Sequence, residues 1–265
     1  MIKLTTNLSD PLLELIHDGL APIDAVEVGP WFSVPQICNY RQMLPGYLFY
    51  FHGGDLIERV GLIPGATSKI AAYLNCTSSP WVSMHITMWL PGMVGLMLRR
   101  GWRVPLPNPE QATRWFIRRV KRYVQSAPTP VLLENVTPLP FDGYDFEVRP
   151  ERIAQVLEQT RCGFVLDIGH AQVSAATLGI GVCDYLGDLP LDRVVQIHIS
   201  GPRMREGHLV DAHEPLQETD YALLNYVLER TQPQVVTLEY IRERQALQEQ
   251  LSRLRGIVDS FNASF

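Results

Sequence analysis

The sequence lacks the positive charge that nucleic-acid-binding proteins show. Its 23 lysines and arginines are outnumbered by 28 acidic residues, and the formal net charge is −5. Without a basic surface a protein cannot neutralise a phosphate backbone, so a nucleic-acid partner is not expected. Long apolar runs are also missing: none approaches the roughly 20 residues of a membrane span, and the N-terminus shows no signal-peptide pattern. We therefore expect a cytoplasmic protein without membrane segments.

Cysteine is scarce, and the few cysteines are not paired in sequence. They are Cys38, Cys76, Cys162 and Cys183, and no two of them form a CxxC motif. In a chain of 265 residues this pattern does not predict a disulfide framework, and a reducing compartment is the default expectation.

The chain does contain a regular alternation of short apolar runs and helical segments. The runs that we interpret as strands are Ile2–Thr6, Ile23–Gly29, Tyr47–Gly54, Trp81–Ile86, Pro130–Asn135, Phe164–Gly169, Val194–Ser200 and Val235–Tyr240. Eight strands interleaved with helices predict an α/β protein, a single (β/α)8 or TIM barrel that spans residues 1–265 as one domain. A doubly wound open sheet is the structural alternative.

Several helices have recognisable ends or faces. Ser9 is a candidate N-cap for the first helix, and the segment 108–127 is amphipathic, with Trp115, Val120 and Tyr123 expected on its inner face. The arginines and lysines of that segment are expected to face solvent. We also expect a helix over 64–75 and a closing helix over 242–261, and a short helix packed on the barrel within the apolar insert 88–103.

Polar residues gather where the predicted strands end, which is the edge at which TIM barrels carry their active sites. Five of the seven histidines and four carboxylates lie at these strand ends or in the segments that follow them. The nine candidates are His52, His85, Glu134, Asp167, His170, His198, Asp211, His213 and Glu239. We expect Asp211 and His213 to lie on a loop, and we assign His17 and His208 to the surface.

Such a cluster is costly without a partner, because converging carboxylates repel one another and lose hydration. Divalent cations remove both penalties, and imidazole with carboxylate but no thiolate suits iron, manganese or zinc. Nine ligands exceed what one octahedral ion needs, so two or three metals are indicated. Each residue alone has an ordinary interpretation, such as a hydrogen-bonded core histidine, an arginine partner or a helix cap. To explain the whole cluster without a metal, such an interpretation would have to hold separately at each of the successive strand ends.

The same residues lie in segments that resemble a known family, the multinuclear non-heme iron-dependent oxidative enzymes. The segments, in family order, are HGG at His52, SMH at His85, LLENV at Glu134, LDIGHAQVSA at Asp167, QIHISG at His198, LVDAHEPL at Asp211 and TLEY at Glu239. The resemblance covers most of the chain and implies a TIM barrel of the xylose-isomerase-like superfamily.

The resemblance also implies a metal layout. One iron would bind to His52, His85 and Glu134, and a second would bind to Glu134, Asp167, His198 and Glu239. These two sets are bridged by Glu134, and His170, Asp211 and His213 would form a third site. Asn135 would support the ligands.

The activity that the resemblance implies is oxidative. Two or three irons in a mixed Fe(II)/Fe(III) state would use dioxygen to modify a residue, often a cysteine or the C-terminal residue, of a ribosomally made precursor peptide. Glu134, Asp167 and His198 would be the catalytic residues, and a companion protein would bind the peptide leader. The alternative from another class is a zinc or manganese hydrolase or isomerase related to the apurinic endonucleases and sugar isomerases. A metal-binding scaffold without activity fits less well, because purely structural metal sites are usually closed and mononuclear.

Overall fold

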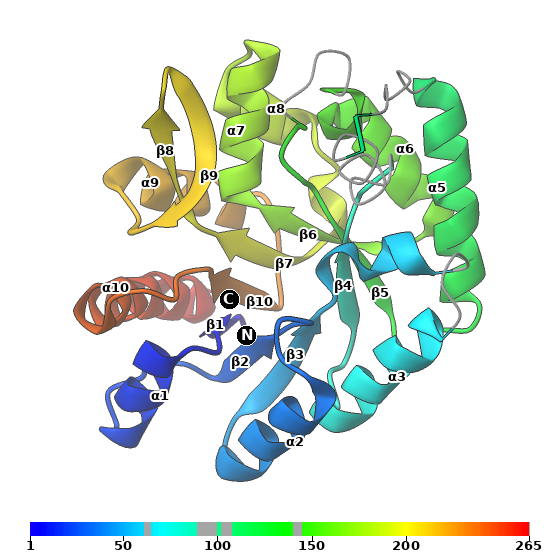
Figure 1. Ribbon diagram of the computed structural model, residues 1–265. Coiled ribbons are helices and arrows are strands. Elements are labelled where there is room, and N and C mark those ends of the chain that lie inside the picture. Colours follow the sequence, from blue (N-terminus) through cyan, green and yellow to red (C-terminus); the bar gives the residue numbers. More distant parts are fainter. Residues whose placement is uncertain (61–64, 89–99, 102–107, 140–144, 265) are drawn as a thin grey trace.

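The computed structural model describes residues 1–60, 65–88, 100–101, 108–139 and 145–264, and its strands form a closed parallel barrel (Figure 1). The barrel strands are β1 (Lys3–Asn7), β2 (Ala25–Val28), β3 (Leu48–His52), β4 (Val82–His85), β5 (Val131–Glu134), β6 (Gly163–Asp167), β7 (Val194–Ile199) and β10 (Val235–Leu238). Each strand pairs in parallel with the next, and β10 pairs with β1. The predicted TIM barrel is confirmed, and the open-sheet alternative is wrong.

Helices surround the barrel on its outer side (Figure 1). They are α1 (Asp10–His17), α2 (Val34–Met43), α3 (Ala66–Thr77), α5 (Pro109–Val124), α6 (Pro150–Thr160), α7 (Ile168–Leu178), α8 (Val182–Asp188), α9 (Glu218–Leu228) and α10 (Arg244–Ala263), with short 3-10 turns η1 (Gly54–Arg59), η2 (Asp145–Val148) and η3 (Leu191–Arg193). Within the described residues, no helix combines the length and apolarity that crossing a membrane requires. Most of the apolar insert 88–103 lies outside the described residues.

Local sequence explains where the helices begin and which faces they bury. The Ser9 hydroxyl accepts a hydrogen bond from the Leu12 N–H at 3.4 Å, so the predicted N-cap of α1 is confirmed. Helix α5 buries Val120 and Tyr123 as expected, but the expectation for Trp115 is wrong, because its side chain is 37% exposed. Arg119, which we expected to face solvent, is buried, and its guanidinium lies 4.5 Å from the centre of the Trp115 ring.

The barrel interior changes from apolar to charged along the strands. Residues two apart on a strand point to the same side. One interior layer is apolar and consists of Ala25, Tyr50, Trp81, Leu132, Val165 and Val235. Two residues further along β2, β3, β5 and β6, the chain places Glu27, His52, Glu134 and Asp167, all buried. The apolar layer therefore closes the barrel beneath a polar layer at the carboxyl ends of the strands.

An antiparallel hairpin, which we did not predict, follows β7 (Figure 1). It consists of β8 (Gly201–Arg205) and β9 (His208–Glu214). Its turn residues Glu206 and Gly207 both have positive φ, as a type I′ turn requires. Asp211 and His213 thus lie on strand β9, not on a loop as expected, and His213 Nδ1 lies 3.2 Å from Asp211 Oδ1.

The hairpin depends on a glycine at its base. A Cβ atom on Gly201 would lie 2.2 Å from the Glu214 carbonyl oxygen and 2.8 Å from that of Pro215. Gly201→Ala is therefore expected to lower the free energy of unfolding by about 1–3 kcal/mol, measured by chemical denaturation. Gly256→Ala in α10 is the control, because its Cβ would meet nothing and alanine should stabilise that helix by about 0.5–1 kcal/mol. A Gly201→Ala protein as stable as wild type would contradict this account of the hairpin.

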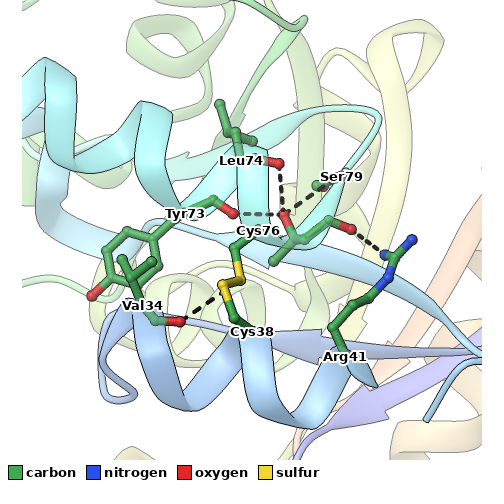
Figure 2. Close-up of a disulfide and its surroundings, with 8 residues drawn as sticks. Val34, Cys38, Arg41, Tyr73, Leu74, Cys76 and Ser79 are labelled. Carbon is green, nitrogen blue, oxygen red and sulfur yellow. Dashed lines mark hydrogen bonds between the residues drawn. A yellow bond between two sulfur atoms is a disulfide. The ribbon is translucent and has the colours of Figure 1, made fainter. Parts of the chain in front are cut away.

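Two cysteines form a disulfide, contrary to our expectation. Cys38 on α2 and Cys76 on α3 are joined with their Cα atoms 5.3 Å apart (Figure 2). Cys162 and Cys183 are free. The bond closes a sequence separation of 38 residues and links two helices that pack against each other. The spacing gave no signal for this pair, because the helices bring the two positions together only in the folded chain.

Candidate metal centre

The nine predicted ligands converge at the carboxyl ends of the barrel strands. The barrel register sets two cross-strand pairs: His85 lies opposite Glu134, and Asp167 lies opposite His198. The nine positions are His52 on β3, His85 on β4, Glu134 on β5, Asp167 on β6, His170 on α7, His198 on β7, Asp211 and His213 on β9, and Glu239 directly after β10. The two histidines assigned to the surface, His17 and His208, are exposed.

The first compact group consists of His52, His85 and Glu134, whose candidate ligand atoms all lie within 4.8 Å of one another. The Nε2 atoms of the two histidines are 3.2 Å apart, and His85 Nε2 is 3.8 Å from Glu134 Oε2. Nδ1 of His52 lies 3.0 Å from the Ser83 hydroxyl, and Nδ1 of His85 lies 2.8 Å from Asp55 Oδ1. His85 therefore faces the group through Nε2, whereas His52 contacts it through both nitrogens, because its Nδ1 also lies 3.4 Å from Glu134 Oε2.

The second compact group consists of Glu134, Asp167 and His198. His198 Nδ1 lies 3.2 Å from Glu134 Oε1 and 3.1 Å from Glu239 Oε1. The two oxygens of Glu134 therefore face different partners: Oε2 faces the first group and Oε1 faces His198. This arrangement is what a carboxylate needs in order to bridge two cations.

The third predicted set is connected pairwise rather than gathered at one point. His170 Nε2 lies 3.4 Å from Asp211 Oδ2, and His213 Nδ1 lies 3.2 Å from Asp211 Oδ1. His213 Nε2 also lies 2.9 Å from Glu239 Oε2. Among the described residues, this set is not one of the groups whose ligand atoms all lie within 4.8 Å. His213 has a φ of 47°, a strained backbone conformation that persists when the surrounding structure holds the side chain in place.

Charges in the cluster compensate one another. Burial raises the pKa of Glu134, but the nearby histidines, His198 foremost, outweigh burial and lower that pKa to about 2. Burial raises the pKa of Asp167 to about 6. For His198 and His170, burial lowers the pKa, but the surrounding carboxylates raise it well above its usual range. Protons on the imidazoles thus balance the carboxylates, and a metal ion would take over that role by displacing them.

Three buried ligand atoms make no hydrogen bond of good geometry: Glu134 Oε2, Asp167 Oδ2 and His198 Nδ1, although two carboxylate oxygens lie within 3.2 Å of the last atom. The other oxygen of Asp167 accepts the His170 N–H at 2.6 Å and so caps α7, as one of the ordinary interpretations proposed. An unsatisfied buried polar atom costs about 1–3 kcal/mol. Glu134 Oε2 faces the first compact group, whereas Asp167 Oδ2 and His198 Nδ1 belong to the second. One cation in each group would satisfy all three atoms, and the imidazole and carboxylate donors suit iron, manganese or zinc.

Sequence reasoning missed two carboxylates that contact the cluster. Glu27 on β2 is fully buried and lies 3.2 Å from His198 Nε2, and Asp55 holds His85. Glu27 had a signal: it follows Ala25 by two residues, just as Glu134 follows Leu132, so it interrupts an otherwise apolar inward face. Asp55 follows its strand by three residues and showed no comparable pattern.

A cavity of about 780 Å³ opens above the cluster. Its floor includes His52, His85 and Glu134. Apolar side chains form much of its wall, and they are Leu8, Pro11, Trp31, Phe32, Ala212 and Ile241. Trp31 is 52% exposed, and its ring centre lies 6.4 Å from that of His52. A ligand in the cavity would therefore meet charged side chains at the floor and apolar side chains along the wall.

Solved structures with similar coordinates share this fold at low sequence identity. A D-tagatose 3-epimerase-like protein aligns with a TM-score of 0.63 and 14% identity over 99% of each chain. The 3-keto-D-glucoside 4-epimerase YcjR of E. coli gives a TM-score of 0.61 at 14% identity, over 97% of this chain and 100% of that one. A structure of the IolI protein with a bound zinc atom gives 0.60 at 15% identity, over 99% of this chain and 97% of that one. At such identities the likeness shows the fold alone.

Sequence comparison is more specific. A UPF0276 protein of Anaeromyxobacter sp. is 33% identical over 161 residues, which are 60% of this chain and 52% of that protein. A UPF0276 protein of Bordetella pertussis is 31% identical over 143 residues, 51% of this chain and 49% of that protein. The chain thus spans about half the length of the curated relatives that it matches.

A family model matches residues 46–259, which include all nine predicted ligands. Its description is RiPP precursor modification enzyme MbnB/TglH/ChrH, where RiPP denotes a ribosomally made and modified peptide. The chain belongs to this family of RiPP precursor modification enzymes.

Proposed function

We propose that this protein is a multinuclear iron enzyme that uses dioxygen to oxidise a residue of a ribosomally made precursor peptide. Family membership supports a peptide substrate. The observation that carries the metal proposal is Glu134, whose two oxygens face two compact donor groups, and each group contains buried atoms without a well-aligned hydrogen bond. Two cations sharing one carboxylate explain that arrangement more simply than any set of hydrogen bonds does.

In this proposal the candidate ligands form three sets, and the first two each bind a metal ion. His52, His85 and Glu134 hold one ion, and a second ion is held by Glu134, Asp167, His198 and Glu239. His170, Asp211 and His213 form a third set of ligands. Bound iron together with dioxygen supplies the oxidising power, while Glu134, Asp167 and His198 fix the position at which the substrate residue reacts.

The cavity supports a peptide segment as the ligand. Its apolar wall would pack against substrate side chains while a cysteine thiolate or a carboxylate reached the floor. Arg242 is the only lysine or arginine among the described residues that line the cavity, and it is held by Glu214 at 2.7 Å and by the Ala212 carbonyl at 2.8 Å. We further propose that a companion protein binds the peptide leader and that the reaction takes place in the cytoplasm.

Metal analysis tests the proposal directly. Protein purified without oxygen should carry at least two iron ions per chain, and it should consume dioxygen when the precursor peptide is added. Protein stripped by a chelator should lose dioxygen consumption, regain it with Fe(II), and fail to regain it with zinc. The hydrolase or isomerase alternative expects the opposite: zinc or manganese in the site and no dioxygen consumption. That result would overturn the oxidative proposal while leaving the metal centre in place.

A further inference from the structure

Beside the candidate metal ligands lies a further buried carboxylate that none of the proposed metal sites uses. Glu27 is fully buried on β2, and its Oε2 atom lies 3.2 Å from Nε2 of His198. We infer that Glu27 is a positioning residue: it accepts the Nε2 hydrogen of His198 and thereby turns Nδ1 of that ring toward the metal. This inference rests on the proposed metal centre.

Geometry separates Glu27 from the ligands themselves. Glu27, His198 and Glu239 lie close enough to suggest a cation site of their own. However, Glu134 and Glu239 approach Nδ1 of His198, whereas Glu27 approaches Nε2. The two nitrogens of an imidazole carry lone pairs or hydrogens that point away from each other. An ion bound at Nδ1 between Glu134 and Glu239 is therefore on the opposite side of the ring from Glu27.

A neighbouring glutamine fixes which atom faces His198. The Trp81 indole can only donate, and it does so to Gln196 Oε1 at 3.0 Å, so the amide nitrogen of Gln196 must face the other way. That nitrogen donates to Glu27 Oε2 at 2.7 Å and to the Thr237 hydroxyl at 2.8 Å. Both amide hydrogens are then used. Gln196 Nε2 also lies 2.9 Å from His198 Nε2, but it has no third hydrogen to donate to that atom.

Glu27 is consequently the acceptor available to the His198 Nε2 hydrogen. Its other oxygen, Oε1, accepts from Asn7 Nδ2 at 3.2 Å. Three donors on two strands therefore hold the Glu27 carboxylate of β2: Asn7 on β1, and Gln196 and His198 on β7. A histidine that binds metal through one nitrogen commonly donates the hydrogen on its other nitrogen to a carboxylate, which fixes the tautomer and makes the ligand more basic.

Zinc binding by the full chain tests the inference without any need for substrate. Glu27→Met removes the acceptor and should weaken zinc affinity by about 10–100-fold in a chelator competition titration. Glu27→Gln keeps an acceptor oxygen, and Asn7 can turn its amide to match, so the loss should stay below about 10-fold. At saturating zinc, both variants should bind as many ions as wild type. Asp220→Asn is the matched control, because it alters another buried carboxylate that lies outside the cavity lining and caps α9.

Nitrogen NMR of the histidine rings distinguishes this role from a merely structural one, because loss of structural support alone would not change which His198 nitrogen carries the hydrogen. In the zinc-loaded wild type, His198 should carry its hydrogen on Nε2 in slow exchange with water, and Glu27→Met should make that exchange fast. Wild-type affinity and an unchanged His198 signal in Glu27→Met would overturn the inference. So would the loss of a whole zinc equivalent in Glu27→Gln at saturation, which would make Glu27 a ligand. A wild-type protein that binds no zinc or iron would instead refute the proposed metal centre itself.

Discussion

Replacing Glu134 with glutamine is expected to remove metal from both compact groups at once. Glu134 is almost fully buried, with one oxygen toward His85 and the other 3.2 Å from His198. Glutamine keeps the shape of the side chain but loses the charge and one ligand oxygen, so it cannot bridge two cations. Loss of a residue that only supports a ligand typically lowers metal affinity by about 10–100-fold. Loss of a ligand shared by two ions should therefore lower metal affinity by on the order of 10³-fold. Metal per chain after dialysis, measured by elemental analysis, checks this.

Asp55→Asn provides the graded comparison for Glu134→Gln. Asp55 contacts the centre only through His85 Nδ1, at 2.8 Å, and its side chain is 57% exposed. Asparagine can still accept the His85 hydrogen, so only the first group should weaken, by no more than about 10-fold. If Glu134→Gln retains as much metal as Asp55→Asn, Glu134 does not bridge two ions.

The sequence was sufficient to predict the barrel because its strands are buried on both sides. Runs such as Phe164–Leu166 are apolar throughout, as parallel strands require, and all eight predicted strands occur in the structure. The same logic located the candidate ligands, since a barrel brings the carboxyl ends of its strands to one rim. The structure does gather His52, Glu134, Asp167 and His198 there. That these residues bind iron stays a prediction.

Other features depend on contacts that no local pattern encodes. The disulfide joins cysteines on two helices, and helix α2 buries only Ile37, so its apolar residues do not mark one inner face. Strand β9 was taken for a loop because acidic residues and histidines interrupt its apolar residues, and two of these, Asp211 and His213, face the candidate metal centre. Trp115 lies at the edge of its helix face, where Arg119 covers its ring, and hydrophobicity alone cannot distinguish such an edge from the core.

Removing the side chain of Asn135 is expected to cost both stability and metal. Asn135 is fully buried; its Nδ2 donates to the Asp167 carbonyl at 2.9 Å, and its Oδ1 accepts the Asp167 N–H at 2.9 Å. Asn135→Ala leaves two backbone groups without partners, each worth about 1–3 kcal/mol, so the free energy of unfolding should fall by about 2–5 kcal/mol. The backbone that carries Asp167 is then no longer held, and metal affinity should drop by about 10–100-fold. Denaturation and metal titration measure the two effects separately.

Asn262 on α10 is the control for Asn135, because its side chain also clamps a backbone segment but lies far from the candidate ligands in sequence. Its side chain makes an equivalent pair of hydrogen bonds to the backbone of Ile2, at 2.6 and 3.0 Å, where the two ends of the chain meet (Figure 1). Asn262→Ala should cost about 1–2 kcal/mol, less than Asn135→Ala because the pair is only partly buried, and it should leave metal affinity unchanged. Equal metal loss in both variants would mean that general destabilisation weakens binding. Loss confined to Asn135→Ala would show that this clamp holds Asp167 where a cation needs it.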